Sequence, residues 1–264
     1  MSAGIIFRSY NRFVYTKWAL KALEQNTNWD LIDEFIACDA NSEDGTKDLI
    51  EEFLAKICDK VSVMSFDILP GNVGLPLYLA AERSKCDYLH FVDNDHFVQK
   101  NWNEFALTAI QWAKRFGINC VCHFLSDEEM VQNDKPISMG PWSLYPVQYC
   151  GGKCTVTRQF VLQDGPRGKL KDYKNQDGYM PWWAWHQYFK GQIAALRPPV
   201  MIWPLDIAKD REWQFQHREW PQTDTLLASA LEECTIELRE EYIKKGWMRS
   251  RQALLVRGLY GKVK

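Results

Sequence analysis

Residues 88–95, Tyr-Leu-His-Phe-Val-Asp-Asn-Asp, decide how the rest of the chain is interpreted. A short, mostly apolar run ends in two carboxylates, Asp93 and Asp95, with one residue between them. Such a run predicts a strand that is covered on both faces, which is typical of a mainly parallel sheet. Ligands of open α/β sheets bind just outside the carboxyl ends of these strands. The sequence therefore places two carboxylates where such proteins bind their ligands.

Asp93 and Asp95 are candidate ligands of a divalent cation. Residues two apart on an extended segment point the same way, so both carboxylates can meet one ion. Mg²⁺ and Mn²⁺ bind carboxylate oxygens together with phosphate oxygens of a substrate, so a diphosphate-bound cation is the expected ligand. The alternative is an ordinary polar turn after a strand, because Asp and Asn are common turn residues.

Length and composition indicate a globular protein. A chain of 264 residues is long enough for one large domain, or for a domain plus an excursion, with an ample core. Its 46% of hydrophobic and 25% of charged residues are ordinary for a soluble domain and exclude a disordered chain. We expect no transmembrane segment, because no apolar run approaches the ~20 residues that a membrane span needs. The N-terminus leads directly into a strand-like segment without a signal-peptide pattern, which indicates a cytoplasmic protein.

Eight cysteines are scattered through apolar segments, which is typical of reduced thiols in a cytosolic protein. A zinc site built from Cys120, Cys122, His123, Cys150 and Cys154 is conceivable. Their spacings are not the usual CxxC pairs, however, and alternate residues of a strand are more simply core.

The near-neutral total charge of −2 hides a basic C-terminus. Residues 242–264 contain seven Lys or Arg and no acidic residue, which leaves −9 on the 241 residues before them. This tail is expected to contact an anionic membrane surface or nucleic acid, or to be a solvated C-terminal helix.

Strands and helices alternate along the first half of the chain. This alternation predicts an α/β fold with a doubly wound, mainly parallel sheet. The expected strands are residues 4–9, 32–38, 61–66 and the run before Asp93, and the expected helices are residues 15–25, 47–57 and 75–84.

The second half is less regular. We expect a helix at 103–116, with Phe105 on its buried side, a strand at 119–125, and an irregular segment at 126–149. A strand and short helix at 150–162, a loop at 163–178, a helix at 179–190, a strand at 200–203 and a helix at 223–245 follow. The expected divisions are a binding half at 1–125, a looser half at 126–222, and a C-terminal helix with the basic tail at 223–264.

Four short motifs occur in order along the first half. They are Ser9-Tyr10-Asn11-Arg12, Asp39-Ala-Asn-Ser-Glu-Asp-Gly-Thr46, Asn72-x-Gly74 and Asp93-Asn94-Asp95. Together they resemble the nucleotide-sugar-binding half of family 2 glycosyltransferases of the GT-A fold. The resemblance implies a GT-A-type sheet with a looser acceptor-side half, and a nucleoside-diphosphate sugar as donor.

The resemblance also implies roles for individual residues of the first two motifs. Ser9, Tyr10 and Asn11 would lie beside the nucleoside, and Arg12 would meet donor phosphate unless it forms a surface ion pair. Asp39 would accept a hydrogen bond from the ring N–H of the base, a charge-assisted bond stronger than a neutral one. Ser42, Asp44, Gly45 and Thr46 more simply shape the turn, and Asp44 or Thr46 is expected to cap the next helix.

In the later motifs, Asn72 and Gly74 would close over the donor or merely begin a helix. Asp93 would face the ribose or the sugar with Asn94 beside it, and both Asp93 and Asp95 would contact the cation. The implied cation is Mn²⁺ or Mg²⁺.

Residues of the second half complete the implied site. Gly152, in the segment 150–158, would line the sugar. Asp177 would be the catalytic base unless it merely caps the following helix, with Gln176 standing where an acid is frequent in the family. Asp172 or Asp164 is the fallback. His217 is a further candidate metal ligand, against the alternative of a solvated histidine.

The implied reaction is an inverting, metal-assisted and non-processive sugar transfer. The donor that the resemblance favours is a UDP-sugar. Membrane helices and a Gln-x-x-Arg-Trp motif, which processive relatives carry, are not recognised in the sequence. The acceptor hydroxyl would belong to a glycan, a lipid-linked molecule or nucleic acid, and a hydroxymethylated base of phage-type DNA is one alternative. A sugar-nucleotide pyrophosphorylase or a non-catalytic sugar-nucleotide-binding protein are alternatives from other classes.

Overall fold

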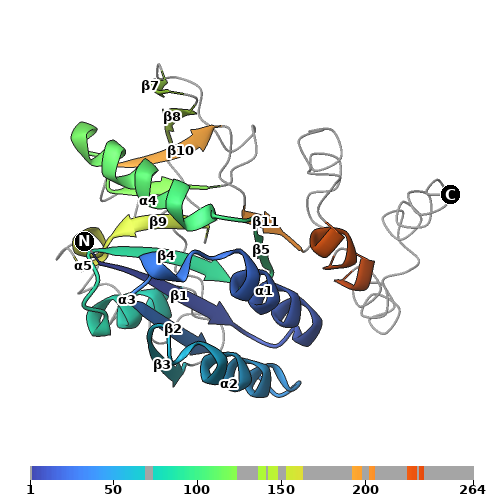
Figure 1. Cartoon of the computed structure of the whole chain (residues 1–264). Helices are drawn as coiled ribbons and strands as arrows, with labels where there is room; N and C mark the ends of the chain where they lie inside the picture. The colour runs from blue at the N-terminus through green and yellow to red at the C-terminus, as the bar shows by residue number, and fades with distance from the viewer. Residues whose placement is uncertain are drawn as a thin grey trace, which may run out of the picture. The chain divides into compact units, whose positions relative to one another are not determined.

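Strands and helices alternate from the N-terminus as the apolar segments predict (Figure 1). In this computed structural model the first elements are β1 Ala3–Ser9, α1 Phe13–Asn26, the short 3-10 helix η1 Trp29–Leu31, β2 Glu34–Asp39, α2 Thr46–Ile57, β3 Ser62–Asp67, α3 Gly74–Arg83 and β4 Tyr88–Asp93. Each expected strand and helix of this half is present, with ends that differ by one or two residues.

The structure describes residues 2–68, 74–123, 136–140, 142–147, 153–162, 192–197, 202–205, 225–230 and 232–234. The chain forms two units, Met1–Trp203 and Pro204–Lys264. The first unit contains the sheet discussed below. In the second, residues 225–230 and 232–234 are helical, within the helix expected at 223–245.

The sheet reverses its direction of growth at β1. Its nine strands lie in the order β3-β2-β1-β4-β9-β6-β10-β8-β7, and β1 pairs in parallel with both β2 and β4. The chain builds outward from β1 through β2 to β3, and then returns to place β4 on the other side of β1. Ligands of open α/β sheets bind at such a switch point. The carboxyl ends of β1, β2 and β4 therefore meet where a ligand is expected.

Among the described residues, five later strands extend the same sheet in mixed directions, and two others form a separate two-stranded sheet. The remaining elements are β5 His96–Val98, α4 Trp102–Ala113, the 3-10 helix η2 Lys114–Phe116, β6 Cys120–Cys122, β7 Ile137–Met139, β8 Trp142–Pro146, β9 Cys154–Thr157, α5 Arg158–Leu162, β10 Ile193–Arg197 and β11 Ile202–Pro204. β9 lies between β4 and β6 and is antiparallel to both. The two halves of the sequence thus share one sheet, and the fold is the predicted α/β class.

Three expectations about the second half need correction. The segment expected to be irregular contains the hairpin β7–β8, and β10 was not predicted at all. These strands have only three to five residues, too few to establish a periodic pattern. Phe105 of α4 is 38% exposed rather than buried, with its ring 5.6 Å from that of Trp142. The loop and helix expected at 163–190 lie outside the described residues.

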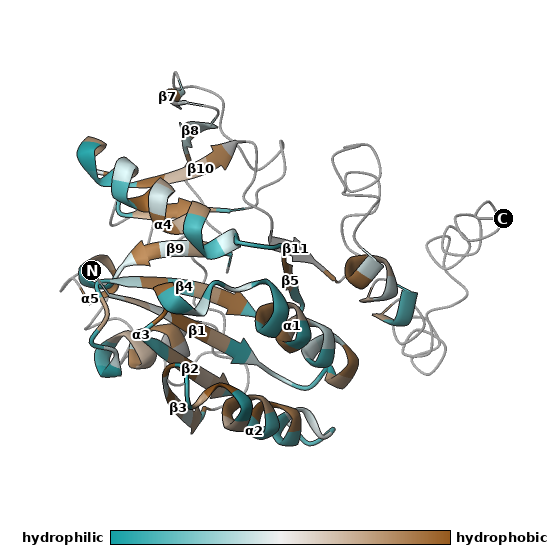
Figure 2. Ribbon diagram, viewed as in Figure 1, coloured by the Kyte–Doolittle hydropathy of each residue, from teal (hydrophilic) through white to brown (hydrophobic). Residues whose placement is uncertain are grey.

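Apolar side chains cover both faces of the central strands. On one face Ile6, Ile36 and Leu89 belong to a core cluster with Leu77 of α3 and Phe160 of α5. On the other face the rings of Phe7 and Phe35 lie 6.1 Å apart, and Phe35 packs against Phe53 of α2 at 5.2 Å. The central strands are largely brown in Figure 2, whereas α2 and α4 show both colours, as helices with one buried side do. Two-sided burial explains why these strands read as continuous apolar runs.

The cysteines of the described part are mainly free and buried. Cys38, Cys86, Cys120 and Cys154 are buried free thiols, and burial raises the pKa of the Cys38, Cys86 and Cys154 thiols. Such thiols are inert core residues. Cys122 is disulfide-bonded, so the expectation of reduced thiols is wrong at this position. The described residues contain no Cys–His group with metal-binding geometry. Among them there is also no helix both long and apolar enough to span a membrane.

Two buried histidines share one hydroxyl group inside the sheet. Thr155 of β9 places its Oγ1 2.7 Å from His90 Nδ1 and 2.6 Å from His123 Nε2. The other ring nitrogens, His90 Nε2 and His123 Nδ1, are buried without a protein partner. The pKa of each imidazole is lowered from 6.5 to about 3, by burial and, for His90, to a smaller extent also by the His123 ring. Both rings are therefore neutral in the folded protein at physiological pH.

We expect acid to destabilise the fold in part through these two histidines. Below pH 6.5 the unfolded chain binds protons that the folded chain cannot bind until about pH 3, so the free energy of unfolding falls as pH decreases through this window. Each histidine contributes a slope of up to ~1.4 kcal/mol per pH unit. Urea unfolding between pH 7.5 and pH 5 measures it, above the range in which carboxylates titrate. His90→Asn and His123→Asn should each reduce the slope, and a constant stability over this range would contradict the expectation.

Candidate functional site

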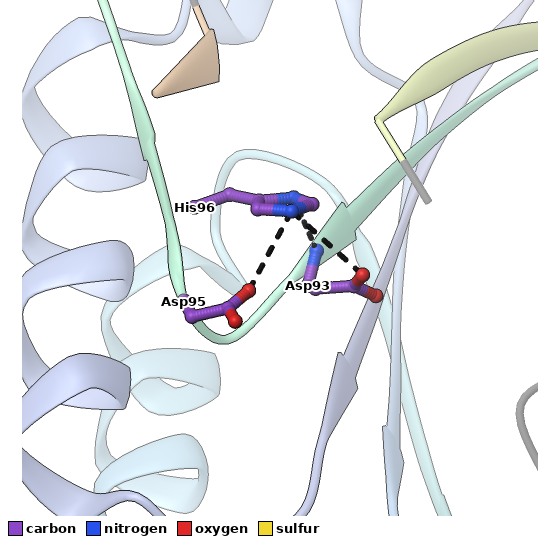
Figure 3. A group of neighbouring side chains, drawn as sticks. All are labelled: Asp93, Asp95 and His96. Carbon is purple, nitrogen blue, oxygen red and sulfur yellow. Dashed lines mark hydrogen bonds and ion pairs between the residues drawn. The ribbon is translucent and has the colours of Figure 1, made fainter. Parts of the chain in front are cut away.

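The two carboxylates of the Asp-Asn-Asp motif come together through a turn. Asp93 is the last residue of β4, Asn94 and Asp95 form a turn, and His96 begins β5. The premise that Asp93 and Asp95 lie on one extended segment is therefore wrong, because the chain bends between them. One ligand atom from each of Asp93, Asp95 and His96 nevertheless lies within 4.8 Å of the others (Figure 3).

His96 is the member of this group that sequence reasoning missed. Its Nδ1 accepts a hydrogen bond of 2.9 Å from the backbone N–H of Asp93. Its Nε2 lies 3.7 Å from Asp93 Oδ2 and 3.5 Å from Asp95 Oδ1. Burial lowers the pKa of His96 to about 3, although the Asp93 carboxylate acts in the opposite direction. The only available signal was its position directly after the motif.

The hydrogen bond to Nδ1 determines what His96 can do. A nitrogen that accepts a hydrogen bond carries no proton, so the neutral ring holds its proton on Nε2. That N–H faces both carboxylates (Figure 3). In this tautomer His96 orients the two carboxylates, and Asp93 and Asp95 are the residues with oxygen atoms to offer a hard cation.

An arginine is paired with each carboxylate. Arg8 Nη2 lies 2.6 Å from Asp93 Oδ1, and Arg12 Nη1 lies 2.8 Å from Asp95 Oδ2. Arg8 stands opposite Asp93 in the pairing of β1 with β4, which brings the two side chains together. Arg12, expected at donor phosphate or in an ion pair, forms an ion pair in this structure. Arg8 was not predicted, because its proximity to Asp93 depends on the strand pairing.

Asp39 lies at the end of β2 in a network of hydroxyl groups. Ser9 Oγ and Ser42 Oγ donate to its Oδ1 at 2.6 and 2.7 Å, and the backbone N–H of Ser42 donates to its Oδ2 at 2.7 Å. A carboxylate has about four lone-pair sites, so these three bonds leave capacity for one more donor on Oδ2. The hydroxyl of Ser9 is committed to Asp39, which it helps to orient.

The loop after β1 has an uncommon backbone that Asn94 supports. Asn11 and Arg12 both adopt left-handed conformations, with φ of 49° and 65°. The Asn94 amide donates to the carbonyl oxygen of Asn11 at 2.7 Å and to Thr16 Oγ1 at 2.8 Å. Both hydrogens of this buried amide are thus used within the protein. Asn94 connects the Asp-Asn-Asp turn to the first motif.

The second motif shapes the same loop from the other side. Asp44 accepts from the backbone N–H of Phe13 at 3.0 Å and from that of Thr46 at 3.1 Å, so it satisfies the first turns of both α1 and α2. Gly45 is the N-cap of α2 with φ of 88°, a conformation that favours glycine. A Cβ at Gly45 would lie 3.3 Å from the Phe13 ring. These contacts agree with the turn-shaping role expected of the motif, but neither Asp44 nor Thr46 is the N-cap residue, so that expectation is wrong.

The remaining predicted residues are only partly described. Tyr10 is 51% exposed next to this loop, and Gly74 is the first residue of α3. Asn72, Gly152, Gln176, Asp177 and His217 lie outside the described residues.

A cavity of about 980 Å³ lies elsewhere in the first unit. Its lining comes from the segments that precede β2 and β3, including Trp29, Asp33 and Lys60. These segments are at the amino ends of the parallel strands, opposite the carboxylates. The converging charged groups lie at the switch-point end and not in this cavity, so the switch-point end is the candidate functional site.

The family described as Glycosyl transferase family 2 matches residues 5–165, which is more than half of the chain. This segment includes all four motifs, β1 from Ile5 onward, β2 to β9 and α5. No curated protein matches the chain.

Solved structures resemble the chain in fold. TarS residues 1–349 of S. aureus in complex with UDP has a TM-score of 0.53 and 14% identity, with 76% of this chain and 60% of that chain covered. The same fragment in complex with UDP-GlcNAc has a TM-score of 0.51 and 14% identity, with 76% and 58% covered. GalNAc-T7 with UDP, GalNAc and Mn²⁺ has a TM-score of 0.50 and 12% identity, with 74% and 43% covered. The chain thus spans 60% or less of each of these chains.

Replacing Asn94 by Leu should loosen the loop after β1. Leu has a similar size but cannot donate to Asn11 and Thr16, so it leaves buried acceptors unpaired at a cost of about 1–3 kcal/mol. Hydrogen exchange at residues 11–13 should become faster. Asn119→Leu, which removes an amide that donates to Gly117 and Gln192, should leave that exchange unchanged. Unaltered exchange in the Asn94 variant would show that the loop does not depend on this amide.

Proposed function

The chain belongs to glycosyl transferase family 2, and from this membership we propose that it transfers a sugar from a nucleoside-diphosphate donor to an acceptor hydroxyl. One observation carries the proposal. The carboxylates of Asp93 and Asp95 converge at the switch point of the sheet, beside two arginines and the buried carboxylate of Asp39. Carboxylates and guanidinium groups side by side suit a donor that is a phosphate anion accompanied by a cation.

The nucleoside would bind at the ends of β1 and β2. Asp39 Oδ2 retains capacity for one more donor, which the ring N–H of a uracil base would supply. Tyr10 offers an exposed aromatic face for stacking on the base, with Asn11 beside it. Uridine is favoured because the TarS fragment and GalNAc-T7 were solved with UDP.

The diphosphate would bind at the end of β4, together with Mn²⁺ or Mg²⁺. The carboxylate oxygens of Asp93 and Asp95 fit a hard divalent cation, and their side chains are 19% and 22% exposed, so a ligand can reach them. When bound, the cation would stabilise the negative charge that develops on the departing diphosphate. Asn72 and Gly74 are proposed to lie over the donor, Gly152 to line its sugar, and His217 to be an additional ligand.

The transfer would proceed as a single displacement with inversion. The acceptor oxygen forms a bond to the anomeric carbon while the bond from that carbon to the diphosphate oxygen breaks, and the diphosphate leaves with the electron pair. Asp177 is proposed to take the proton of the acceptor hydroxyl as the attack develops. The proposed acceptors are a glycan, a lipid-linked molecule or nucleic acid, including a hydroxymethylated DNA base.

The cellular setting is part of the proposal. We propose a cytoplasmic protein whose basic segment 242–264 approaches an anionic membrane surface or nucleic acid. Attraction of either kind would bring the enzyme to its acceptor, and it would weaken as salt increases.

Donor binding should be visible as thermal stabilisation. Among nucleoside diphosphates, UDP with Mn²⁺ should raise the melting temperature by roughly 5 °C at a hundredfold excess over Kd, because it binds only the folded protein. The Asp95→Asn variant should lose most of the Mn²⁺-dependent part of this increase in melting temperature. Asp59→Asn, an exposed carboxylate after α2, should behave as the wild type. If no nucleotide shifts the wild type with or without Mn²⁺, the proposed function is wrong.

Loss of the base should separate binding from chemistry. Asp177→Asn should retain the thermal shift with UDP and Mn²⁺ but release UDP from a UDP-sugar about 10²–10⁴ times more slowly, the usual contribution of a positioned base. Product release from UDP-glucose, UDP-galactose and UDP-GlcNAc, measured by chromatography, gives the rate. If Asp172→Asn or Asp164→Asn causes the loss and Asp177→Asn does not, the base has been misassigned.

A further inference from the structure

Each of the two carboxylates proposed to hold the cation is paired with a guanidinium group. Asp93 pairs with Arg8 through Oδ1, and Asp95 pairs with Arg12 through Oδ2. The other two oxygens, Asp93 Oδ2 and Asp95 Oδ1, face Nε2 of His96 (Figure 3). A cation that binds these carboxylates must therefore compete with two arginines.

Strand pairing and loop geometry place both arginines where they are. Arg8 lies on β1 opposite Asp93, and the side chains of this pair are only 17% and 19% exposed. Arg12 is the N-cap of α1 in a left-handed conformation, and its side chain is 38% exposed, with its guanidinium 5.4 Å from the centre of the Tyr15 ring. The Arg8 pair is thus the more shielded from water, and the Arg12 pair is the more accessible.

The charges of this group are balanced without any ligand. Two carboxylates face two guanidinium groups. A divalent cation alone would leave an excess of positive charge at a partly buried site, and a diphosphate alone would leave an excess of negative charge. Unbalanced charge in such a place is unfavourable. A cation and the diphosphate of a nucleotide sugar arriving together leave the balance unchanged.

We propose that Arg8 and Arg12 hold the carboxylates in the nucleotide-free protein and pass to the diphosphate oxygens when the donor binds with its cation. The inference rests on the proposed function. Guanidinium groups bind phosphate oxygens in the same planar geometry in which they bind carboxylates, so the exchange replaces one charge-assisted bond with another. The carboxylates released in this way are free to bind the cation.

The exchange makes the arginines positioning residues that couple two ligands. Without nucleotide they compete with the cation, and with nucleotide they stabilise the diphosphate. The binding of cation and diphosphate is then positively linked, and the linkage is reciprocal. A cation would not be retained by the empty site, and it would bind together with the donor.

Replacing Arg8 tests the exchange, because it should change two affinities in opposite directions. Full-length wild type and Arg8→Met are titrated with Mn²⁺ alone, with free Mn²⁺ measured by electron paramagnetic resonance. They are then titrated with UDP in EDTA by calorimetry. We expect Arg8→Met to bind Mn²⁺ about fivefold more tightly and UDP about fivefold more weakly, the size expected for one partly exposed ion pair.

Three further variants define the cause. Arg8→Lys keeps the charge but not the planar fork, so its two affinities should lie between those of wild type and Arg8→Met. Arg115→Met removes an exposed arginine of η2 and should match wild type in both titrations. Arg12→Met, at the more exposed pair, should show the same two opposite shifts, and it replaces Arg8→Met if that variant does not fold.

The outcomes separate this inference from the function on which it rests. If wild type binds UDP with Mn²⁺ but the arginine variants bind Mn²⁺ alone no more tightly than wild type, the exchange is wrong and the donor site stands. The same holds if both affinities change in one direction, as a general loss of structure would produce. If wild type does not bind UDP under any of these conditions, the exchange and the proposed function both fall.

Discussion

The parallel pairing of β1 with β2 on one side and β4 on the other is the constraint on which the site depends. It brings together the carboxyl ends of three strands that are spread over more than eighty residues of sequence. Ser9 comes to lie beside Asp39, and Arg8 beside Asp93, as direct consequences of the register. Two-sided burial of these strands keeps the register in place, because a shift by one residue would turn the apolar side chains away from their helices.

The N-terminal half was predictable because each of its strands is a buried apolar run bounded by polar loops. Residues 4–9 and 88–93 are apolar runs of this kind, and the helices between them have one apolar side. β10 and the hairpin β7–β8 gave no comparable signal. Their residues become strands because a neighbouring strand offers hydrogen bonds, and this long-range information is not contained in a segment of three to five residues.

The site shows the same division between local and long-range information. Asp39, Asp93 and Asp95 were predicted because carboxylates at strand ends form recognisable motifs. Arg8 was missed because its contact with Asp93 arises only from the pairing of the two strands. His96 was missed because its position beside two carboxylates cannot be recognised before the turn at Asn94 and Asp95 is known. The residues whose place in the site depends on strand pairing or on the turn were thus the ones that the sequence could not identify.

The amide of Asn94 has a consequence for how the motif is used in sequence comparison and in engineering. A pattern written Asp-x-Asp treats the middle position as free. In this protein the middle residue, Asn94, holds the loop after β1 by donating to the carbonyl oxygen of Asn11 and to Thr16 Oγ1 on α1. Positions 11, 16 and 94 are therefore joined by hydrogen bonds, although position 94 lies far from the other two in sequence. A chimaera that exchanges the loop after β1 between relatives, but not position 94, would combine one protein's loop with the side chain that supports another protein's loop. A sequence search that weights positions 11, 16 and 94 jointly would distinguish chains with this hydrogen-bonded arrangement from chains that share only the two aspartates.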